Sequence, residues 1–246
     1  RYYLDMQLQL LAGSPEFRDL GVVGFWGCNY VDEDLQRWGL ALLRHYFIEG
    51  QREMLSRRYG FTYRLPYLKN ADFGAGLEHW QVSAPDPANV FPGDGKARDF
   101  AKKSLGVWGT KDKEPMNRFA VLRKNAAGEN RIAQKLVHLV PGRKYMLQFV
   151  SLNYYELQTG QRRPHLTGLK AEFLPGEVAI DSEAVHVDRN LNRTPEAGRA
   201  NVHRICFTPK QSEVTLAFTD RDSNGLPGEE LGLTFVQVKP RFLPEP

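Results

Sequence analysis

The sequence predicts a mainly β protein, a β-sandwich of two packed sheets that follows a short α/β segment. Beyond Asn70, about ten short runs show the alternation of apolar and polar residues that is typical of strands with one buried face. Turn-forming pairs such as Pro141-Gly142 and Asn224-Gly225 separate these runs. No helical spacing of apolar residues lies between them, whereas the residues before Pro66 show such spacing repeatedly. Short strands that each bury one face are the pattern of two sheets packed face to face.

The chain changes character over Leu65–Lys69, where Pro66 disfavours helix at the residue before it. We therefore expect two parts, an α/β segment over residues 1–65 and the sandwich over residues 66–246.

The first part has the pattern of a helix, a strand and a second helix. Leu4, Leu8 and Leu11 recur at helical spacing, and the apolar run that follows is too short for a helix. Acidic residues then favour the start of a second helix, because they accept hydrogen bonds from its free N–H groups. One strand cannot form a sheet alone, so we expect this segment to be the end of a larger domain. The expected elements are a helix over Tyr2–Ala12, a buried strand over Gly21–Gly27, a helix that is started by the acidic stretch Asn29–Asp34 and runs to about Glu49, and a further helical stretch over Gln51–Arg58.

The second part is expected to contain the strands of the sandwich and two long polar loops. Alternation places the apolar residues of 145–149 on one strand face, and those of 214–218 on another. The loops, 84–103 and 188–199, are long enough to be functional. The expected strands are Glu78–Ser83, Leu105–Thr110, Phe119–Arg123, Arg131–Leu139, Lys144–Asn153, Leu166–Phe173, Ala184–Val187, Val202–Thr208, Glu213–Thr219 and Leu231–Val238.

Composition and charge exclude several classes of function. The net charge is +4, but basic and acidic residues are interleaved, which argues against a nucleic-acid partner. No apolar run approaches the roughly eighteen residues of a membrane span, and the N-terminal residues lack the pattern of a secretory signal peptide. Cys28 and Cys206 have no metal-ligand or redox spacing, so we expect two buried free thiols.

Residues 66–246 contain several short motifs in a fixed order. They are Asn70-x-Asp-Phe73, Gly76-Leu-x-x-Trp80, Ile132-Ala-Gln134-Lys-Leu136, Leu139-Val-Pro-Gly142-Arg-Lys-Tyr145-x-Leu147-x-Phe149, Phe207-Thr-Pro209 and Val214-Thr-Leu-Ala-Phe218. In these motifs the sequence resembles the jelly-roll carbohydrate-binding modules of the galactose-binding-like class. The resemblance implies a jelly-roll sandwich with an oligo- or polysaccharide as its partner.

The first 65 residues resemble the last βα unit of a bacterial TIM-barrel glycoside-hydrolase-like protein, in the stretches Tyr3–Leu11 and Leu42–Gly50. This resemblance implies a larger parent protein, a barrel domain or another subunit as a partner, and an extracellular or periplasmic location. In such proteins the catalytic carboxylates are expected at the ends of barrel strands. The expected strand leads into Phe25–Asn29, which contains no Asp or Glu, so the resemblance assigns no catalytic carboxylate to this segment. Whether the parent is an active enzyme stays open, and we expect this chain alone to be non-catalytic.

A sugar is recognised by an aromatic side chain that stacks on its C–H face and by planar polar side chains that bond its hydroxyls. The cluster that fits best contains Tyr154 and Tyr155, with Arg162 following. On a strand, adjacent residues point to opposite faces, so we expect one of the two tyrosines in the core and the other exposed. Trp108 lies in an expected strand whose polar side has little cover, so it is a second expected stacking platform.

Three polar residues are expected opposite the apolar positions of their strands, where they could line a concave sheet. They are Gln134, Gln148 and His203. Trp80 is instead expected in the core, as in the modules that the sequence resembles.

The resemblance also implies a structural calcium ion, which takes six to eight oxygen ligands. Asp188, Asp220 and Asp222 are the candidate ligands. The opening motif carries Gly74 where an acidic ligand is common in such modules, and the stretch Asp220–Gly225 lacks the later ligands of an EF-hand.

The sequence therefore leaves three hypotheses for the function. The first is a carbohydrate-binding accessory module of a larger glycoside-hydrolase-like protein. The second is a structural or interaction sandwich that packs on a barrel domain or another subunit without a sugar ligand. The third is part of an active glycosidase whose catalytic carboxylates lie upstream of residue 1.

Overall fold

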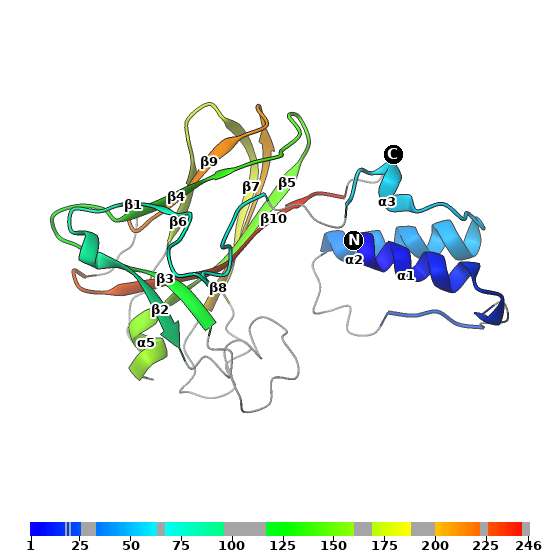
Figure 1. Ribbon diagram of the computed structural model, residues 1–246, viewed down its shortest axis with the longest axis horizontal. Helices are drawn as coiled ribbons and strands as arrows, with labels where there is room; N and C mark the ends of the chain where they lie inside the picture. The colour runs from blue at the N-terminus through cyan, green and yellow to red at the C-terminus, as the bar shows by residue number, and fades with distance from the viewer. Residues whose placement is uncertain are drawn as a thin grey trace. The chain divides into compact units, whose positions relative to one another are not determined.

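The computed structural model divides into two compact units, and each is considered by itself (Figure 1). Unit 1 comprises Arg1–Leu65 with Pro240–Pro246, and unit 2 comprises Pro66–Lys239. The sequence division assigned all of 66–246 to the sandwich, whereas the last residues group with the helices. The structure describes residues 1–17, 19, 21–25, 33–62, 67–95, 117–159, 169–187, 200–221 and 226–242, without the side chains of 117, 184–187 and 200.

Unit 1 is built mainly from two helices that lie side by side in Figure 1. Helix α1 spans Tyr2–Gly13, and helix α2 spans Glu33–Leu43 and continues as the π-helix η3, Arg44–Ile48. Both confirm predicted helices. The further helical stretch is shorter than predicted, because α3 is confined to Leu55–Arg58, and a 3-10 turn, η1, covers Pro15–Phe17. Among the described residues, no helix is long and apolar enough to cross a membrane.

The core of unit 1 forms around the fully buried indole of Trp38. The rings of Phe61 and Phe242 each lie 5.0 Å from it, edge to face. Leu8 of α1 and Leu42 of α2 belong to the same cluster, and Leu8 was expected on the apolar face of its helix. Phe242 comes from the far end of the chain, so this core depends on residues separated by most of the sequence.

Two buried carboxylates of unit 1 are each held by several donors. Asp5 accepts hydrogen bonds from the Tyr46 hydroxyl and from the backbone N–H of Ser56. Asp34 accepts from the guanidinium groups of Arg241 and Arg1. A buried carboxylate is tolerated only when such partners replace its water, so both residues tie separate segments of unit 1 together.

The strand predicted over Gly21–Gly27 is not found where the structure describes it. Residues 21–25 form no strand, and Val22 is 82% exposed. Trp26 and Gly27 lie outside the described residues. Within the described part of unit 1 no other strand offers its N–H and C=O groups, so nothing there stabilises an isolated strand.

Unit 2 confirms the mainly β class, because its strands form two antiparallel sheets. The four-stranded sheet has the order β1-β4-β9-β6, and the six-stranded sheet has the order β2-β3-β10-β5-β8-β7. From β4 onward the chain passes repeatedly from one sheet to the other, which is the connectivity of a jelly-roll sandwich. The strands are β1 Gln81–Ser83, β2 Val90–Gly95, β3 Asn117–Arg123, β4 Arg131–Leu136, β5 Tyr145–Asn153, β6 Lys170–Phe173, β7 Val178–Val187, β8 Ala200–Pro209, β9 Val214–Thr219 and β10 Glu230–Pro240.

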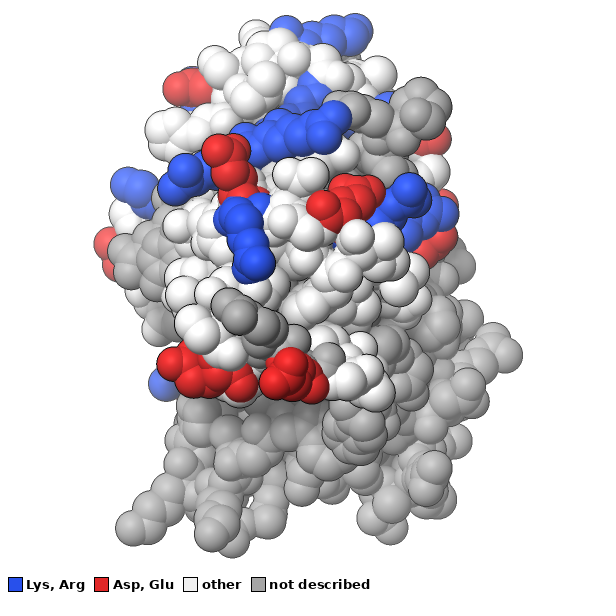
Figure 2. All heavy atoms as spheres, turned by 90° about the vertical axis from the view of Figure 1, so that its right-hand side faces the viewer, with Lys and Arg blue, Asp and Glu red and all other residues white. Residues whose placement is uncertain are grey.

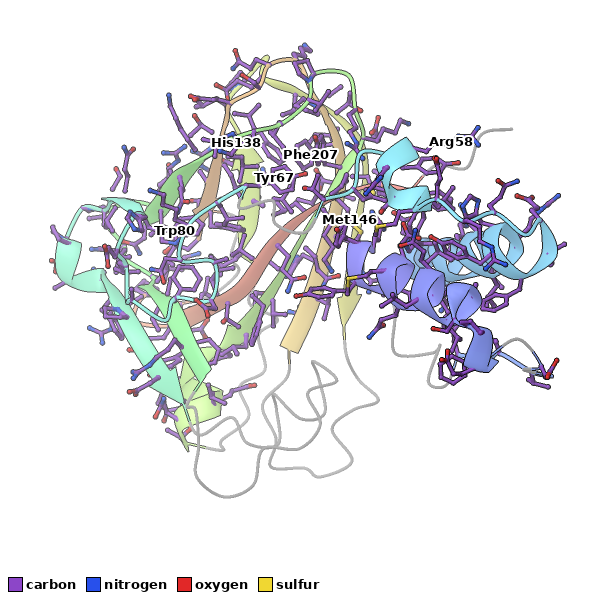
Figure 3. The ribbon with its side chains drawn as sticks, turned by 45° about the vertical axis from the view of Figure 1, so that its right-hand side comes forward. Arg58, Tyr67, Trp80, His138, Met146 and Phe207 are labelled. Atoms are coloured by element: carbon purple, nitrogen blue, oxygen red, sulfur yellow. The ribbon has the colours of Figure 1, made fainter. Side chains whose placement is uncertain are left out.

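The core of the sandwich lies between the two sheets. Phe149 of β5 and Phe218 of β9 meet there with ring centroids 4.9 Å apart, so the predicted apolar faces of these two strands are confirmed. Trp80 is buried and stacks on Phe73 at 5.3 Å, as predicted for a core residue. Figure 3 labels Trp80 and the buried Phe207 in this core.

Strand β7 is longer than the predicted Ala184–Val187, strand β1 is shorter than the predicted Glu78–Ser83, and two further elements of unit 2 were not predicted. Strand β2, Val90–Gly95, lies in the stretch expected to be a long loop and pairs with β3 along its whole length. Helix α5, Tyr154–Thr159, follows β5 where further strand was expected. The predicted strand Leu105–Thr110 lies outside the described residues.

Candidate ligand-binding face

The six-stranded sheet has an inner face toward the other sheet and an outer face turned away from it. Side chains alternate along β5, so Phe149 points inward and its neighbour Gln148 points outward. The register pairs Gln148 with Arg204 of β8, which therefore also lies on the outer face. The predicted outward placement of Gln148 is confirmed.

The middle of the outer face is apolar and is covered by helix α5. Phe119 and Val121 of β3 pack there with Val150 and Leu152 of β5, and Tyr154 closes the cluster from the helix. This cover separates the outer face into two polar ends, one at β2, β3 and β10 and the other at β5 and β8.

Glycines make the approach of α5 possible. A Cβ atom added at Gly93 would lie 2.8 Å from the Tyr154 ring and 2.5 Å from Val121. At Gly95 the same atom would lie 2.6 Å from Leu157. Heavy atoms of unbonded groups do not approach so closely, and close backbone approach is a common reason for glycine in a strand.

Helix α5 begins at Asn153, whose Oδ1 accepts a hydrogen bond from the backbone N–H of Glu156 at 3.0 Å. Tyr154 is buried, and its hydroxyl donates to the carbonyl oxygen of Asp94 at 2.7 Å. Burial raises the pKa of this hydroxyl above its ordinary value. The Gln158 amide donates to the same carbonyl at 2.6 Å, and Tyr155 is half-buried on the helix. Tyr154 therefore anchors α5, and Tyr155 is the more accessible of the two rings.

The first polar end of the outer face consists of Phe91, Arg123 and Glu230. The guanidinium carbon of Arg123 lies 5.0 Å from the centre of the half-buried Phe91 ring. Its Nε and Nη2 donate to Glu230 Oε1 at 3.0 and 2.9 Å. The Arg123 side chain remains 43% exposed, whereas Glu230 is 18% exposed. On the opposite face of these strands, Arg118 forms an ion pair with Asp94 at 2.9 Å.

The second polar end consists of Gln148 and Arg204. Nε of Arg204 donates to Oε1 of Gln148 at 3.3 Å, and both side chains are half-buried. Arg204 was missed by the sequence analysis, although it lies next to the predicted His203 and alternates with the buried Ile205.

His203 lies on the inner face, so its predicted outward placement is wrong. It is paired with Phe149 in the register and stacks on that ring, and Ser151 Oγ lies 2.7 Å from its Nε2. Burial lowers the pKa of His203 to about 4, so the ring is neutral at pH 7. The odd positions of β8 face inward together, which the apolar residues at 205 and 207 could have indicated.

Gln134 also lies on the inner side of its strand, contrary to the prediction. The register pairs it with the fully buried Leu216 of β9. The side-chain amide of Gln134 forms two hydrogen bonds with the backbone of Lys69. Oε1 accepts from the N–H of Lys69 at 2.6 Å, and Nε2 donates to the carbonyl oxygen of Lys69 at 3.1 Å. Gln134 thus fixes the start of unit 2 against β4.

The proposed calcium ligands are only partly described. Asp220 is buried, and Asn130 donates its backbone N–H and its Nδ2–H to the two carboxylate oxygens at 2.8 and 2.7 Å. Asp188 and Asp222 lie outside the described residues. Across the described ranges, no three His, Cys, Asp or Glu side chains come close enough to hold a metal ion. The calcium ion stays a prediction.

Trp108 and Arg162 also lie outside the described residues, so their predicted roles in sugar binding stay predictions. Cys206 is a buried free thiol, as expected, and Cys28 is not described. On the surface drawn in Figure 2, Lys and Arg side chains lie beside Asp and Glu side chains, in keeping with the interleaved charges of the sequence.

No family model matches the chain, and no curated protein matches it. Solved structures similar to it include the enzymatically active domain of tailspike protein 4 from bacteriophage CBA120, with 13% identity, a TM-score of 0.38, and 71% of this chain and 21% of that chain covered.

Two further similar structures are carbohydrate-binding modules. TmCBM61 in complex with β-1,4-galactotriose has 12% identity and a TM-score of 0.37, with 71% of this chain and 98% of that chain covered. A CBM4 structure has 13% identity and a TM-score of 0.30, with 70% of this chain and 99% of that chain covered. At these identities and TM-scores the comparisons assign no family and transfer no ligand.

Proposed function

We propose that unit 2 is a carbohydrate-binding module that engages an oligo- or polysaccharide on the outer face of its six-stranded sheet. The observation that carries the proposal is the first polar end, where the guanidinium of Arg123 lies over the half-buried ring of Phe91 and is fixed by the carboxylate of Glu230. An aromatic ring together with planar polar groups is the combination that sugar recognition needs.

The polar groups of this end are held in place before any ligand binds. Arg123 is fixed by Phe91 on one side and by Glu230 on the other. A side chain that is already ordered loses little conformational freedom on binding, which favours affinity. Tyr155 and Gln158 of α5 supply further aromatic and amide groups on the same face.

The polar groups of this end favour binding over hydrolysis. Glycoside hydrolysis commonly uses two carboxyl groups that flank the scissile bond. The first polar end, as defined by Phe91, Arg123 and Glu230, contributes one carboxylate, and that carboxylate is held by Arg123. A carboxylate held in this way is placed to accept hydrogen bonds from sugar hydroxyls.

As part of the same proposal, the parent is a glycoside-hydrolase-like protein whose catalytic carboxylates lie upstream of residue 1, and its location is extracellular or periplasmic. The support is the resemblance of Tyr3–Leu11 and Leu42–Gly50 to the end of a barrel. Unit 1 would then be the part of the chain that joins the module to the barrel.

The test is isothermal calorimetry of the whole chain against a panel of neutral and acidic polysaccharides. The variant Arg123→Gln should weaken the binding of whichever polysaccharide binds by about tenfold or more, which corresponds to about 1.4 kcal/mol. Lys135→Gln is a matched control, because Lys135 is also an exposed, paired cation but lies on the other sheet. The proposal fails if no polysaccharide binds, or if Arg123→Gln binds as the wild type does.

A second function, an interaction domain without a sugar ligand, is favoured by a separate observation on unit 1. Four apolar side chains there are largely exposed, namely Val22 at 82%, Ile48 at 80%, Leu40 at 65% and Leu10 at 61%. Exposed apolar side chains that gather into one patch are typical of interaction surfaces. Sedimentation of the wild type and of an Ile48→Ser, Leu40→Ser double variant tests this role, which requires that the wild type associate and that the double variant remain monomeric.

A further inference from the structure

We infer that the second polar end of the outer face binds an anionic group, so that the ligand of the module is an acidic polysaccharide that carries carboxylate or sulfate groups. This inference rests on the proposed function and names its substrate class. Its basis is Arg204, a cation of the sheet that forms no ion pair with any carboxylate among the described residues.

The hydrogen bonding of Arg204 differs from that of Arg123 on the same face. Arg123 bonds the carboxylate of Glu230 at 2.9 Å. In the part of the chain that the structure describes, the hydrogen-bond partner of Arg204 is the neutral amide of Gln148, at the long distance of 3.3 Å, and no carboxylate lies within ion-pair distance of it. The guanidinium is always charged at physiological pH.

The strand register shows that the neighbouring positions of the sheet supply no countercharge. Arg204 lies between Gln148 of β5 and Ala184 of β7. Along the strands, the adjacent rows on the same face are Met146, Cys206 and Ser182 on one side and Val150, Val202 and His186 on the other. None of these residues is acidic, and Met146 and Cys206 are buried. The nearest sheet positions around Arg204 therefore supply no carboxylate.

A charge in such surroundings favours an anion from outside the chain. Removing a cation from water without a partner costs free energy, and an anionic ligand oxygen would offset that cost. The guanidinium presents several N–H donors in a plane that matches carboxylate and sulfate oxygens, and the bond to Gln148 uses its Nε. The Nε2–H groups of Gln148 add donors beside it.

The experiment compares two polysaccharides that share a backbone and differ in charge. Polygalacturonate and its fully methyl-esterified form are titrated into the whole chain, and a sulfated galactan is compared with its desulfated form to distinguish carboxylate from sulfate recognition. The wild type should bind at least one acidic form about tenfold more tightly than its neutral counterpart, and salt should reduce the preference.

Two variants locate the preference at Arg204. Arg204→Gln should bind acidic and neutral forms alike, while Arg204→Lys should retain part of the preference, because it keeps the charge but not the planar donors. Lys210→Gln is the matched control, since it removes one positive charge at an exposed position just after β8 and should leave the preference unchanged. Thermal melting of each variant verifies that the chain is folded.

The outcomes separate this inference from the proposed function. Equal binding of acidic and neutral forms by the wild type overturns the inference and leaves the carbohydrate-binding function intact. A preference that survives in Arg204→Gln, or that disappears in Lys210→Gln as well, also overturns it, because the preference would then come from the overall charge. If neither these polymers nor any neutral polysaccharide binds, both the inference and the proposed function fail.

Discussion

The imidazole ring of His203 lies flat against the phenyl ring of Phe149, with centroids 4.2 Å apart and planes inclined by 4°. Ser151 completes the environment with a hydrogen bond of 2.7 Å to Nε2. This places a titratable group inside the sandwich, where protonation would put a charge among buried rings. Burial therefore lowers the pKa of His203 to about 4, from the 6.5 of an exposed histidine.

We predict that this histidine makes the sandwich less stable as the pH falls. Above pH 6.5 the ring is neutral in both the folded and the unfolded chain. Between pH 6.5 and about 4 the unfolded chain binds a proton that the folded chain does not, so the free energy of unfolding decreases with falling pH. The full loss is about 3 kcal/mol. Urea unfolding at a series of pH values measures it.

The comparison variant for this prediction is His203→Gln, which does not titrate. It should be less stable than the wild type at pH 8, because the stacking is lost, but its stability should change less between pH 6.5 and 4. Parallel pH profiles for the two proteins would contradict the prediction.

The contact of Tyr154 with Gly93 predicts a steric cost for any larger residue at that position. Gly93→Val should lower the free energy of unfolding by about 1–3 kcal/mol, because the added atoms overlap Tyr154 and Val121. Gly74→Ala is the control, since a Cβ atom there would lie 3.4 Å from its nearest neighbour, an ordinary contact. Chemical denaturation measures both, and equal stability of the two variants would show that α5 does not pack on Gly93.

The aromatic core of unit 1 predicts that Phe242 is required for its stability. Phe242→Ala should cost about 3–5 kcal/mol, because it leaves a cavity beside Trp38. Hydrogen exchange should show lost protection in α1 and α2, with β5 unchanged, because β5 belongs to the other unit. Leu226→Ala, at an exposed position, serves as the control. Unchanged protection of the helices would contradict the packing described.

The hydrogen bonds of Asp220 allow the calcium prediction to be tested. Asp220→Asn should destabilise unit 2 by about 1–3 kcal/mol, because an amide N–H would face a donor of Asn130. If Asp220 is purely structural, EDTA leaves the melting temperatures of the wild type and the variant unchanged. If EDTA lowers the melting temperature of the wild type and calcium restores it, while the variant is insensitive, Asp220 is a calcium ligand.

Strands with strong alternation could be predicted from the sequence, and the element between Val90 and Gly95 could not. Pro92, Gly93 and Gly95 are residues that usually mark a loop. They form a strand because β3 supplies hydrogen-bond partners along the whole stretch, and because the glycines admit the side chains of α5. Tertiary context of this kind is not visible in the local sequence.

Helix α5, by contrast, carries a local signal that the alternation of β5 concealed. Asn153 is followed three residues later by Glu156, which is the spacing of a helix N-cap with an acidic third residue. With this signal, Tyr154 and Tyr155 would have been assigned to a helix, and the argument from opposite strand faces would not have applied. Only the expectation that one ring is more buried than the other is met.

On the candidate face, too, some residues could be placed from the sequence and others could not. Gln148 was placed correctly, because the apolar residues on either side of it in β5 define the inner face. His203 and Gln134 were placed on the wrong face, although each shares its parity with buried residues of its own strand. Phe91, Arg123 and Glu230 come from three different strands, so their proximity depends on sheet order, which the sequence does not specify.

The chain leaves unit 1 once and returns to it once, since residues 240–242 contribute Arg241 and Phe242 to the same contacts that Asp34 and Trp38 make. The sandwich is therefore a guest domain inserted into a host domain, unit 1. The two segments of the host, before residue 66 and from residue 240 onward, are linked covalently only through the guest. A single protease cut at either connection would leave both pieces associated, and release of the sandwich would require two cuts. Excising the sandwich for study would likewise divide the host, unless a short peptide reconnects residue 65 to residue 240.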